Sequence, residues 1–75
     1  MTIERPLDAL NQAKDGAVLV ELKNGNTIRG KLIAFDIHLN VVLDDAEELK
    51  SGEVARRLGR TLIRGDTVIL IMPTE

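Results

Sequence analysis

The clearest pattern in the chain is an alternation of polar and apolar positions over residues 17–23. Valine and leucine occupy the even positions, whereas Glu21 and Lys23 occupy odd ones. Side chains of a β-strand point alternately to opposite faces, so this alternation predicts a half-buried strand. The Asn-Gly-Asn sequence at 24–26 that follows is typical of a tight turn. We therefore expect a β-hairpin.

The second strand of this hairpin is expected over residues 27–35. Ile28, Leu32 and Ala34 are expected to face inward, and the basic residues near them to face outward. Gly30 falls on the inward face. A glycine inside a strand marks a sharp bend or a close approach of another backbone. Strong bending closes a small barrel, so we expect a strongly curved sheet.

A short helix is expected before the hairpin, over about residues 5–14. Pro6 suits the first turn of a helix, and Asp8 favours the positive end of the helix dipole. Leucines with helical spacing follow, and the Asp-Gly pair at 15–16 ends the pattern. A helix of this length is not stable alone, so it has to lie on the sheet.

The middle of the chain is less clearly patterned. A third strand is expected from near residue 38 through 43, and an acidic, polar loop over about 44–52. Residues 53–63 fit both a helix face and a strand face. Gly59 and Thr61 favour a strand, which we adopt.

The closing segment, residues 67–72, is apolar on both faces and follows a turn at 64–66. A strand that is apolar on both faces is expected to be covered on both faces. A small barrel has little to cover its outer side, so the short helix can cover part of it and another subunit the rest. Contact between unlike strand edges is heterologous and closes into a ring when the rotation fits.

Composition narrows the possible classes. The chain has 75 residues, which is one small domain, with 44% hydrophobic and 29% charged residues and a net charge of −2. It is therefore not a generally basic nucleic-acid binder. It has no cysteine and one histidine, which argues against a metal site, and we expect no cofactor. No membrane span or signal peptide is evident, so a cytoplasmic protein is expected.

Two polar clusters are the candidate site. Asp36, His38 and Asn40 are spaced two residues apart, so a strand would present them on one face. The second cluster is Arg64-Gly65-Asp66, just before the last apolar run. If the fold brings the clusters together, they form a small site for a flat, hydrogen-bonding ligand such as a nucleobase.

These segments together resemble the two motifs of the Sm family. The sequences VLVELKNG at 18–25, IRG at 28–30 and FDIHLNV at 35–41 resemble the first Sm motif, which we assign to about 17–45. IRGDTVILI at 63–71 resembles the second, assigned to about 60–72. The Arg-Pro-Leu-Asp opening of the expected helix is similar to that of archaeal Sm-like proteins. The bacterial Hfq relatives have a different second motif. The resemblance covers nearly the whole chain as a single domain, residues 1–75.

The resemblance implies a mostly β fold with an N-terminal helix on a strongly bent five-stranded antiparallel sheet. It also implies a homo-oligomeric ring, most often of seven identical subunits, joined by the fourth strand of one subunit and the fifth of the next. Binding of single-stranded, uridine-rich RNA at the inner rim of that ring is implied as well, for RNA processing, stability or chaperoning.

By the same resemblance, His38 and Arg64 sandwich one uracil, which both side chains can do by stacking. Asn40 would read the base edge, since its amide offers a donor and an acceptor. The Gly65 N–H would also donate to the base. Asp66 would hold Asn40 or Arg64 in place, and Asp36 would tie down the loop through backbone N–H groups.

Other functions fit parts of the sequence. The ring could be a scaffold for RNA-processing proteins without sequence-specific RNA recognition. An enzyme using Asp36, His38 and Asp66 lacks a reactive-serine signature, so we expect no catalysis. Arg5 is a candidate for a secondary RNA contact. Three arginines are open to several interpretations, as a solvated face, interface ion pairs or phosphate contacts: Arg56, Arg57 and Arg60.

Overall fold

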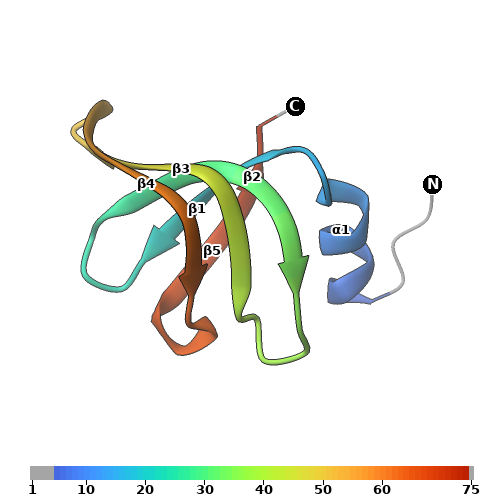
Figure 1. The fold of residues 1–75 in the computed structure, drawn as a ribbon. Helices are drawn as coiled ribbons and strands as arrows, with labels where there is room; N and C mark the ends of the chain where they lie inside the picture. The colour runs from blue at the N-terminus through green and yellow to red at the C-terminus, as the bar shows by residue number, and fades with distance from the viewer. Residues whose placement is uncertain (1–4, 75) are drawn as a thin grey trace.

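The computed structural model describes residues 5–74, which form one helix packed on a five-stranded antiparallel sheet (Figure 1). The elements are α1 (Pro6–Ala13), β1 (Ala17–Leu22), β2 (Thr27–Phe35), β3 (Val41–Lys50), β4 (Glu53–Ile63), the 3-10 turn η1 (Gly65–Thr67) and β5 (Val68–Pro73). The strand order is β4-β3-β2-β1-β5, so β4 and β5 are the two edges. The predicted fold class is confirmed.

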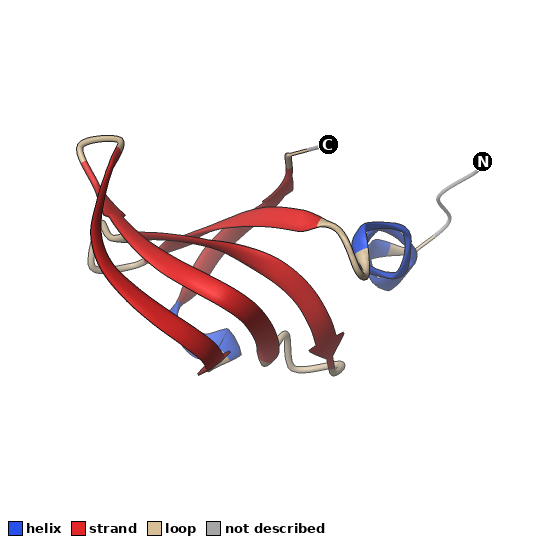
Figure 2. Ribbon diagram, turned by 45° about the horizontal axis from the view of Figure 1, so that its top comes forward, coloured by secondary structure: helices blue, strands red, loops and turns tan. Residues whose placement is uncertain are grey.

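The sheet is strongly curved, and the long strands sweep round a common core (Figure 2). The pairing of β2 with β3 shifts register between Arg29 and Lys31, at Gly30. A Cβ built on Gly30 would lie 3.0 Å from the Asp44 carbonyl oxygen and from the Leu43 Cβ. The close approach predicted for this glycine is therefore confirmed.

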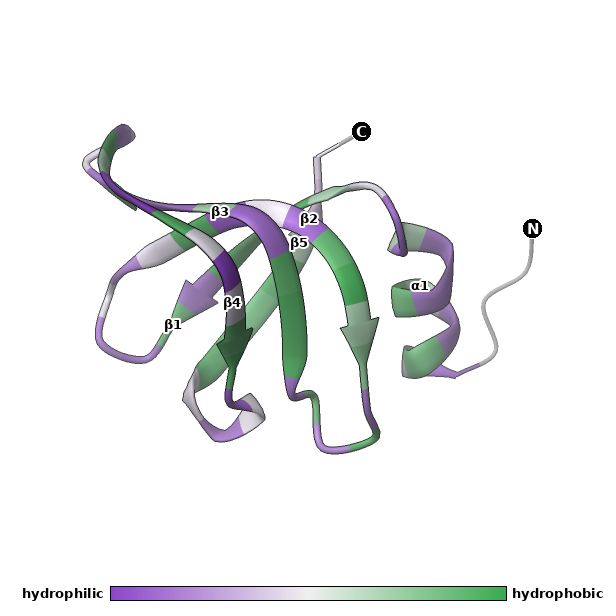
Figure 3. Ribbon diagram, in the orientation of Figure 1, coloured by the Kyte–Doolittle hydropathy of each residue, from purple (hydrophilic) through white to green (hydrophobic). Residues whose placement is uncertain are grey.

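The core lies on the concave side of the sheet. Val18 and Val20 of β1 face inward, as the alternation predicts, with Leu32 of β2 and Leu43 of β3, and all four are 0% exposed. Leu10 of α1 joins this cluster, so the helix covers the core. Figure 3 shows the apolar stretches of β2, β3 and β4 gathered at the end that faces the loops after β2 and β4.

Two expectations about strand positions are wrong. The segment expected as an acidic loop at 44–52 is mostly strand, because β3 continues to Lys50 and only the Ser51-Gly52 turn separates it from β4. Ala34 is exposed instead of inward, since a second register shift between Leu32 and Ala34 changes the face. The ambiguous segment 53–63 is a strand, as adopted.

In the described part of the chain, no helix is long and apolar enough to cross a membrane.

Candidate functional site

The first polar cluster lies in a turn between β2 and β3. The expectation that a strand presents these residues is wrong, since residues 36–40 are outside both strands and Leu39 has a φ of 62°. Instead, Asp36 Oδ1 accepts hydrogen bonds from the backbone N–H of His38 (2.8 Å) and of Asn40 (3.1 Å). The Asp36 carboxylate therefore gathers the cluster by capping the turn, as an Asx motif does.

Asp36 also holds the side chain of Asn40, whose Nδ2 donates to Asp36 Oδ2 at 3.0 Å. This hydrogen bond is the main cause that lowers the pKa of Asp36, and the backbone N–H groups of His38 and Asn40 lower it further. Each of these donors favours the ionised carboxylate. The predicted supporting role of Asp36 agrees with these contacts.

The second cluster lies in the turn from β4 to β5. Thr67 closes this turn, because its N–H and its hydroxyl both donate to the Arg64 carbonyl, at 3.0 Å and 2.7 Å. Arg64 Nη2 donates to Asp66 Oδ2 at 3.0 Å. Of the two partners expected for Asp66, the structure therefore shows Arg64. Sequence reasoning missed the contribution of Thr67, although a threonine three residues after a turn carbonyl is a recognised signal.

The two turns touch each other through Asn40 and Gly65. The Gly65 N–H donates to Asn40 Oδ1 at 2.8 Å. These partners fix the amide orientation: a backbone N–H can only donate and the Asp36 carboxylate can only accept, so Oδ1 faces Gly65 and Nδ2 faces Asp36. The fold therefore brings the two polar clusters together, which is the condition that the sequence analysis set for a site.

Gly65 has to be a glycine here for steric reasons. A Cβ built on it would overlap the His38 carbonyl oxygen and lie 2.8 Å from the Leu39 carbonyl carbon. The backbone that carries His38 is therefore packed directly against the turn that carries Arg64. In this structure the Gly65 N–H is used by Asn40, whereas the resemblance implied a direct donor to a base.

The side chains that remain available for a ligand are at the surface. His38 is exposed, and the Arg64 side chain is 76% exposed. Asn40 is half-buried between the two turns, with a second N–H on Nδ2 beyond the one given to Asp36. An imidazole, a guanidinium and an amide thus lie on two turns that touch each other, and these groups can bind a planar ring with polar edges.

The remaining sequence candidates lie elsewhere. Arg5 is exposed at the start of α1, where its backbone N–H donates to Asp8 Oδ2 at 3.1 Å. Within residues 5–74, no cluster of three metal-ligating side chains is found.

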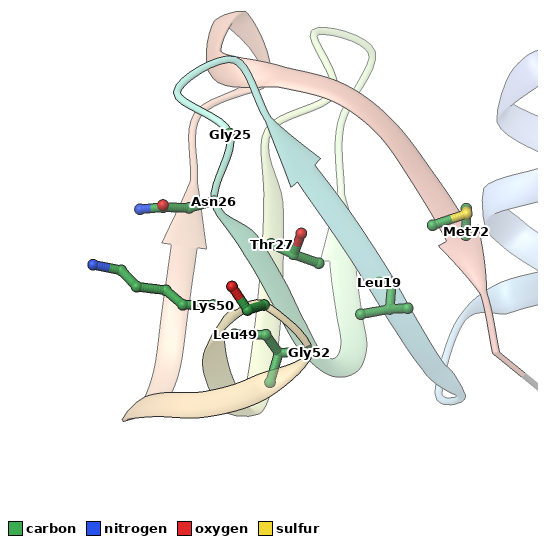
Figure 4. Close-up of a pocket in the computed structure, with 9 residues that line it drawn as sticks. Leu19, Gly25, Asn26, Thr27, Leu49, Lys50, Gly52 and Met72 are labelled. Carbon is green, nitrogen blue, oxygen red and sulfur yellow. The ribbon is translucent and has the colours of Figure 1, made fainter.

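A cavity of about 510 Å³ lies at the opposite ends of the strands, lined by side chains such as Leu19, Leu49 and Met72 (Figure 4). It is separate from the two polar turns.

The fold and this site define a small Sm-type domain, and the sequence comparison agrees. The chain belongs to the LSM domain family, whose model matches residues 8–73. An snRNP Sm-like protein of Pyrococcus abyssi is 57% identical over 72 residues, covering 96% of each chain.

Solved structures agree with this family assignment. The Sm protein of Pyrococcus abyssi in complex with a uridine heptamer superposes with a TM-score of 0.91 at 56% identity, over 95% of this chain and 100% of that one. The SmAP1 heptamer of P. aerophilum superposes with a TM-score of 0.89 at 35% identity, over 99% of each chain.

Proposed function

We propose that the chain binds single-stranded, uridine-rich RNA as a ring of identical subunits, with one base in each subunit, and that it acts without catalysis. The observation that carries this proposal is the Asn40 bridge to the Gly65 N–H at 2.8 Å, which joins the turns of His38 and Arg64. The similar Pyrococcus abyssi structure, which contains a uridine heptamer, supports the choice of ligand.

Each side chain then has a defined role. His38 and Arg64 stack on the two faces of a uracil, and Asn40 hydrogen-bonds to the edge of the base. Uracil offers an acceptor, a donor and an acceptor along its pairing edge, and an amide can match two of these in turn. Gly65 acts by packing the two turns together, and Asp36 and Asp66 orient Asn40 and Arg64.

The two edge strands support the ring. β4 and β5 lie at opposite ends of the sheet, and both expose large apolar side chains, such as Leu62 (66% exposed) and Ile69 (57% exposed). Pairing of the β4 edge with the β5 edge of the next copy covers them and repeats round a closed ring. The P. aerophilum relative forms a heptamer. Repetition of one weak base site in every subunit gives tight binding to one strand.

The test is fluorescence anisotropy of labelled oligo-U and oligo-C at one fixed salt concentration, with the oligomeric state measured by native mass spectrometry. We expect a strong preference for oligo-U, which His38→Ala or Arg64→Ala abolishes while the ring stays intact. Ile37→Ala is the matched control, because Ile37 is 74% exposed in the same turn.

Three outcomes would count against this proposal. Retention of oligo-U binding by the His38→Ala, Arg64→Ala double variant would refute the assigned site. Equal affinity for oligo-U and oligo-C would reduce it to a nonspecific stacking surface. An intact ring that binds neither RNA would favour the scaffold function.

A further inference from the structure

The face of the sheet away from the core carries two transverse rows of charge across β2, β3 and β4. In the first row, Glu47 accepts from Arg29 of β2 (2.7 Å) and from Arg57 of β4 (2.8 Å). In the second row, Asp44 accepts two hydrogen bonds from Arg60 of β4, at 3.1 Å and 3.0 Å. Asp44 also lies directly opposite Lys31 in the pairing of β3 with β2. Each carboxylate is thus flanked by two cations.

The carboxylates lie deeper than the cations. The Glu47 side chain is 16% exposed, whereas that of Arg57 is 82% exposed. The Asp44 side chain is 33% exposed and that of Arg60 is 68% exposed. A ligand that approaches this face therefore meets guanidinium groups first. Salt screens a charge more strongly the further it lies from the ligand, so the outer cations dominate the local field.

Asp45 is a third acidic residue beside these rows. It is exposed and lines a shallow hollow together with Glu47 and Arg57. Four cations and three carboxylates make up these rows together with Asp45, so this cluster carries one positive charge on a chain whose net charge is −2. Because the chain as a whole is acidic, any positive charge that attracts a polyanion has to be local, as it is in this cluster.

The ion pairs also fix the orientation of the guanidinium groups. Arg60 uses Nε and Nη2 on Asp44, and Arg57 uses Nη1 on Glu47. The other edge of each group is directed away from the carboxylate and keeps its N–H donors, which match the oxygens of a phosphate. An arginine that is already ordered loses less side-chain entropy when it binds.

We propose that this outer face, formed by Arg29, Lys31, Arg57 and Arg60, is a second RNA contact that binds the phosphodiester backbone. Arg29 and Lys31 are two residues apart on β2, so on this strand the two rows are spaced by about 7 Å. That spacing is close to the separation of successive phosphates in an extended single strand. The choice of RNA as the polyanion rests on the proposed function, whereas the phosphate contact itself does not.

The contact is distinct from the uracil site in position and in chemistry. Asn40 lies just before the start of β3, whereas Asp44 and Glu47 lie further along this strand. Phosphate contacts carry no sequence information, in contrast to an amide that reads a base edge. A long RNA strand could therefore use both surfaces, while a short oligo-U is held at the uracil site alone.

The test is the salt dependence of binding to long poly-U and to short oligo-U. The variants are Arg57→Gln and Arg60→Gln, alone and combined. In these variants Glu47 still pairs with Arg29 and Asp44 still has Lys31 beside it, so neither carboxylate loses all of its cations. Arg56→Gln is the matched control: this arginine is on the same strand and 67% exposed, but it pairs with the largely buried Glu48.

For poly-U, we expect the slope of log K against log salt to become shallower by about 0.7 for each phosphate that the variant no longer binds. The affinity of these variants for short oligo-U is expected to stay within twofold of that of the parent protein. The affinity of Arg56→Gln for poly-U is expected to stay within twofold as well. The proposal is overturned if the slope is unchanged, if Arg56→Gln changes it equally, or if the combined variant dissociates the ring, which would make the rows an interface between subunits.

The same titration in a His38→Ala background separates the two proposals. Loss of uridine preference with a remaining Arg57-dependent slope supports both surfaces. Unchanged uridine preference refutes the uracil site but leaves the slope as an independent test of the outer face. A slope that no longer depends on Arg57 refutes the outer face alone.

Discussion

Gly65→Ala tests whether the contact between the two turns creates the site. The added methyl group would overlap the His38 carbonyl oxygen, so the turns have to separate and the hydrogen bond from Gly65 N–H to Asn40 is broken. Overpacking costs about 1–3 kcal/mol, and loss of the hydrogen bond about 0.5–1.5 kcal/mol. Alanine restricts the unfolded chain, which offsets about 0.4–1 kcal/mol. The expected net loss of stability is about 0.5–4 kcal/mol.

The stability is measured by urea unfolding at a fixed protein concentration, and oligo-U affinity by fluorescence anisotropy. We expect the affinity to fall about tenfold or more, because misplacing His38 and Arg64 would remove the proposed stacking, which contributes about 1–3 kcal/mol per base.

Gly59→Ala is the control for this experiment. Gly59 has a φ of 70° and open space where a Cβ would lie, so this substitution strains the backbone of β4 away from the site. It is expected to lower stability while leaving the affinity for oligo-U unchanged. A Gly65→Ala variant with unchanged stability and affinity would refute the packing argument.

Three further effects follow from the hydrogen bonds and the core. Because its pKa is lowered, ionised Asp36 stabilises the turn at pH values above the ordinary pKa of 3.8, and this contribution is lost as the pH falls through the folded-state pKa. The backbone amide NMR shifts of His38 and Asn40 should therefore titrate together. Independent titration of the two amides would contradict the shared cap. Asn40→Asp puts two carboxylates face to face, so it should raise the pKa of Asp36 and weaken oligo-U binding, and unchanged NMR titration would argue against the contact. Leu32→Ala empties a fully buried position and should cost about 2–5 kcal/mol in urea unfolding, whereas Ile69→Ala, at a 57% exposed position, should cost little when the monomer is measured.

Local patterns were enough to predict most elements. The alternation in β1 and the Asn-Gly-Asn turn specify the first hairpin, and Pro6 with Asp8 marks the start of α1, which begins and ends within a residue of the expected bounds. These features depend on neighbours in the sequence, so they can be recognised without the rest of the fold.

The errors came from contacts between distant residues. Residues 44–50 are acidic, but they form a strand because arginines of β2 and β4 lie beside them and compensate their charge. The pKa values of Asp44 and Glu47 are lowered mainly by hydrogen bonds from Arg60 and Arg29, respectively. A composition that favours a loop in isolation is thus stable in the middle of a sheet.

The sequence by itself determined the small mostly β fold, the family and the residue types of the candidate site. Only the tertiary structure decided how that site is built, since the amide of Asn40 is held between Asp36 and Gly65, residues that lie on different turns. It also decided that the arginines of β4 divide between the two faces of the sheet, with Arg57 on Glu47 and Arg56 on Glu48. The physical reason is that strand pairing, register shifts and curvature set the position of each side chain, and these depend on residues far apart in the chain.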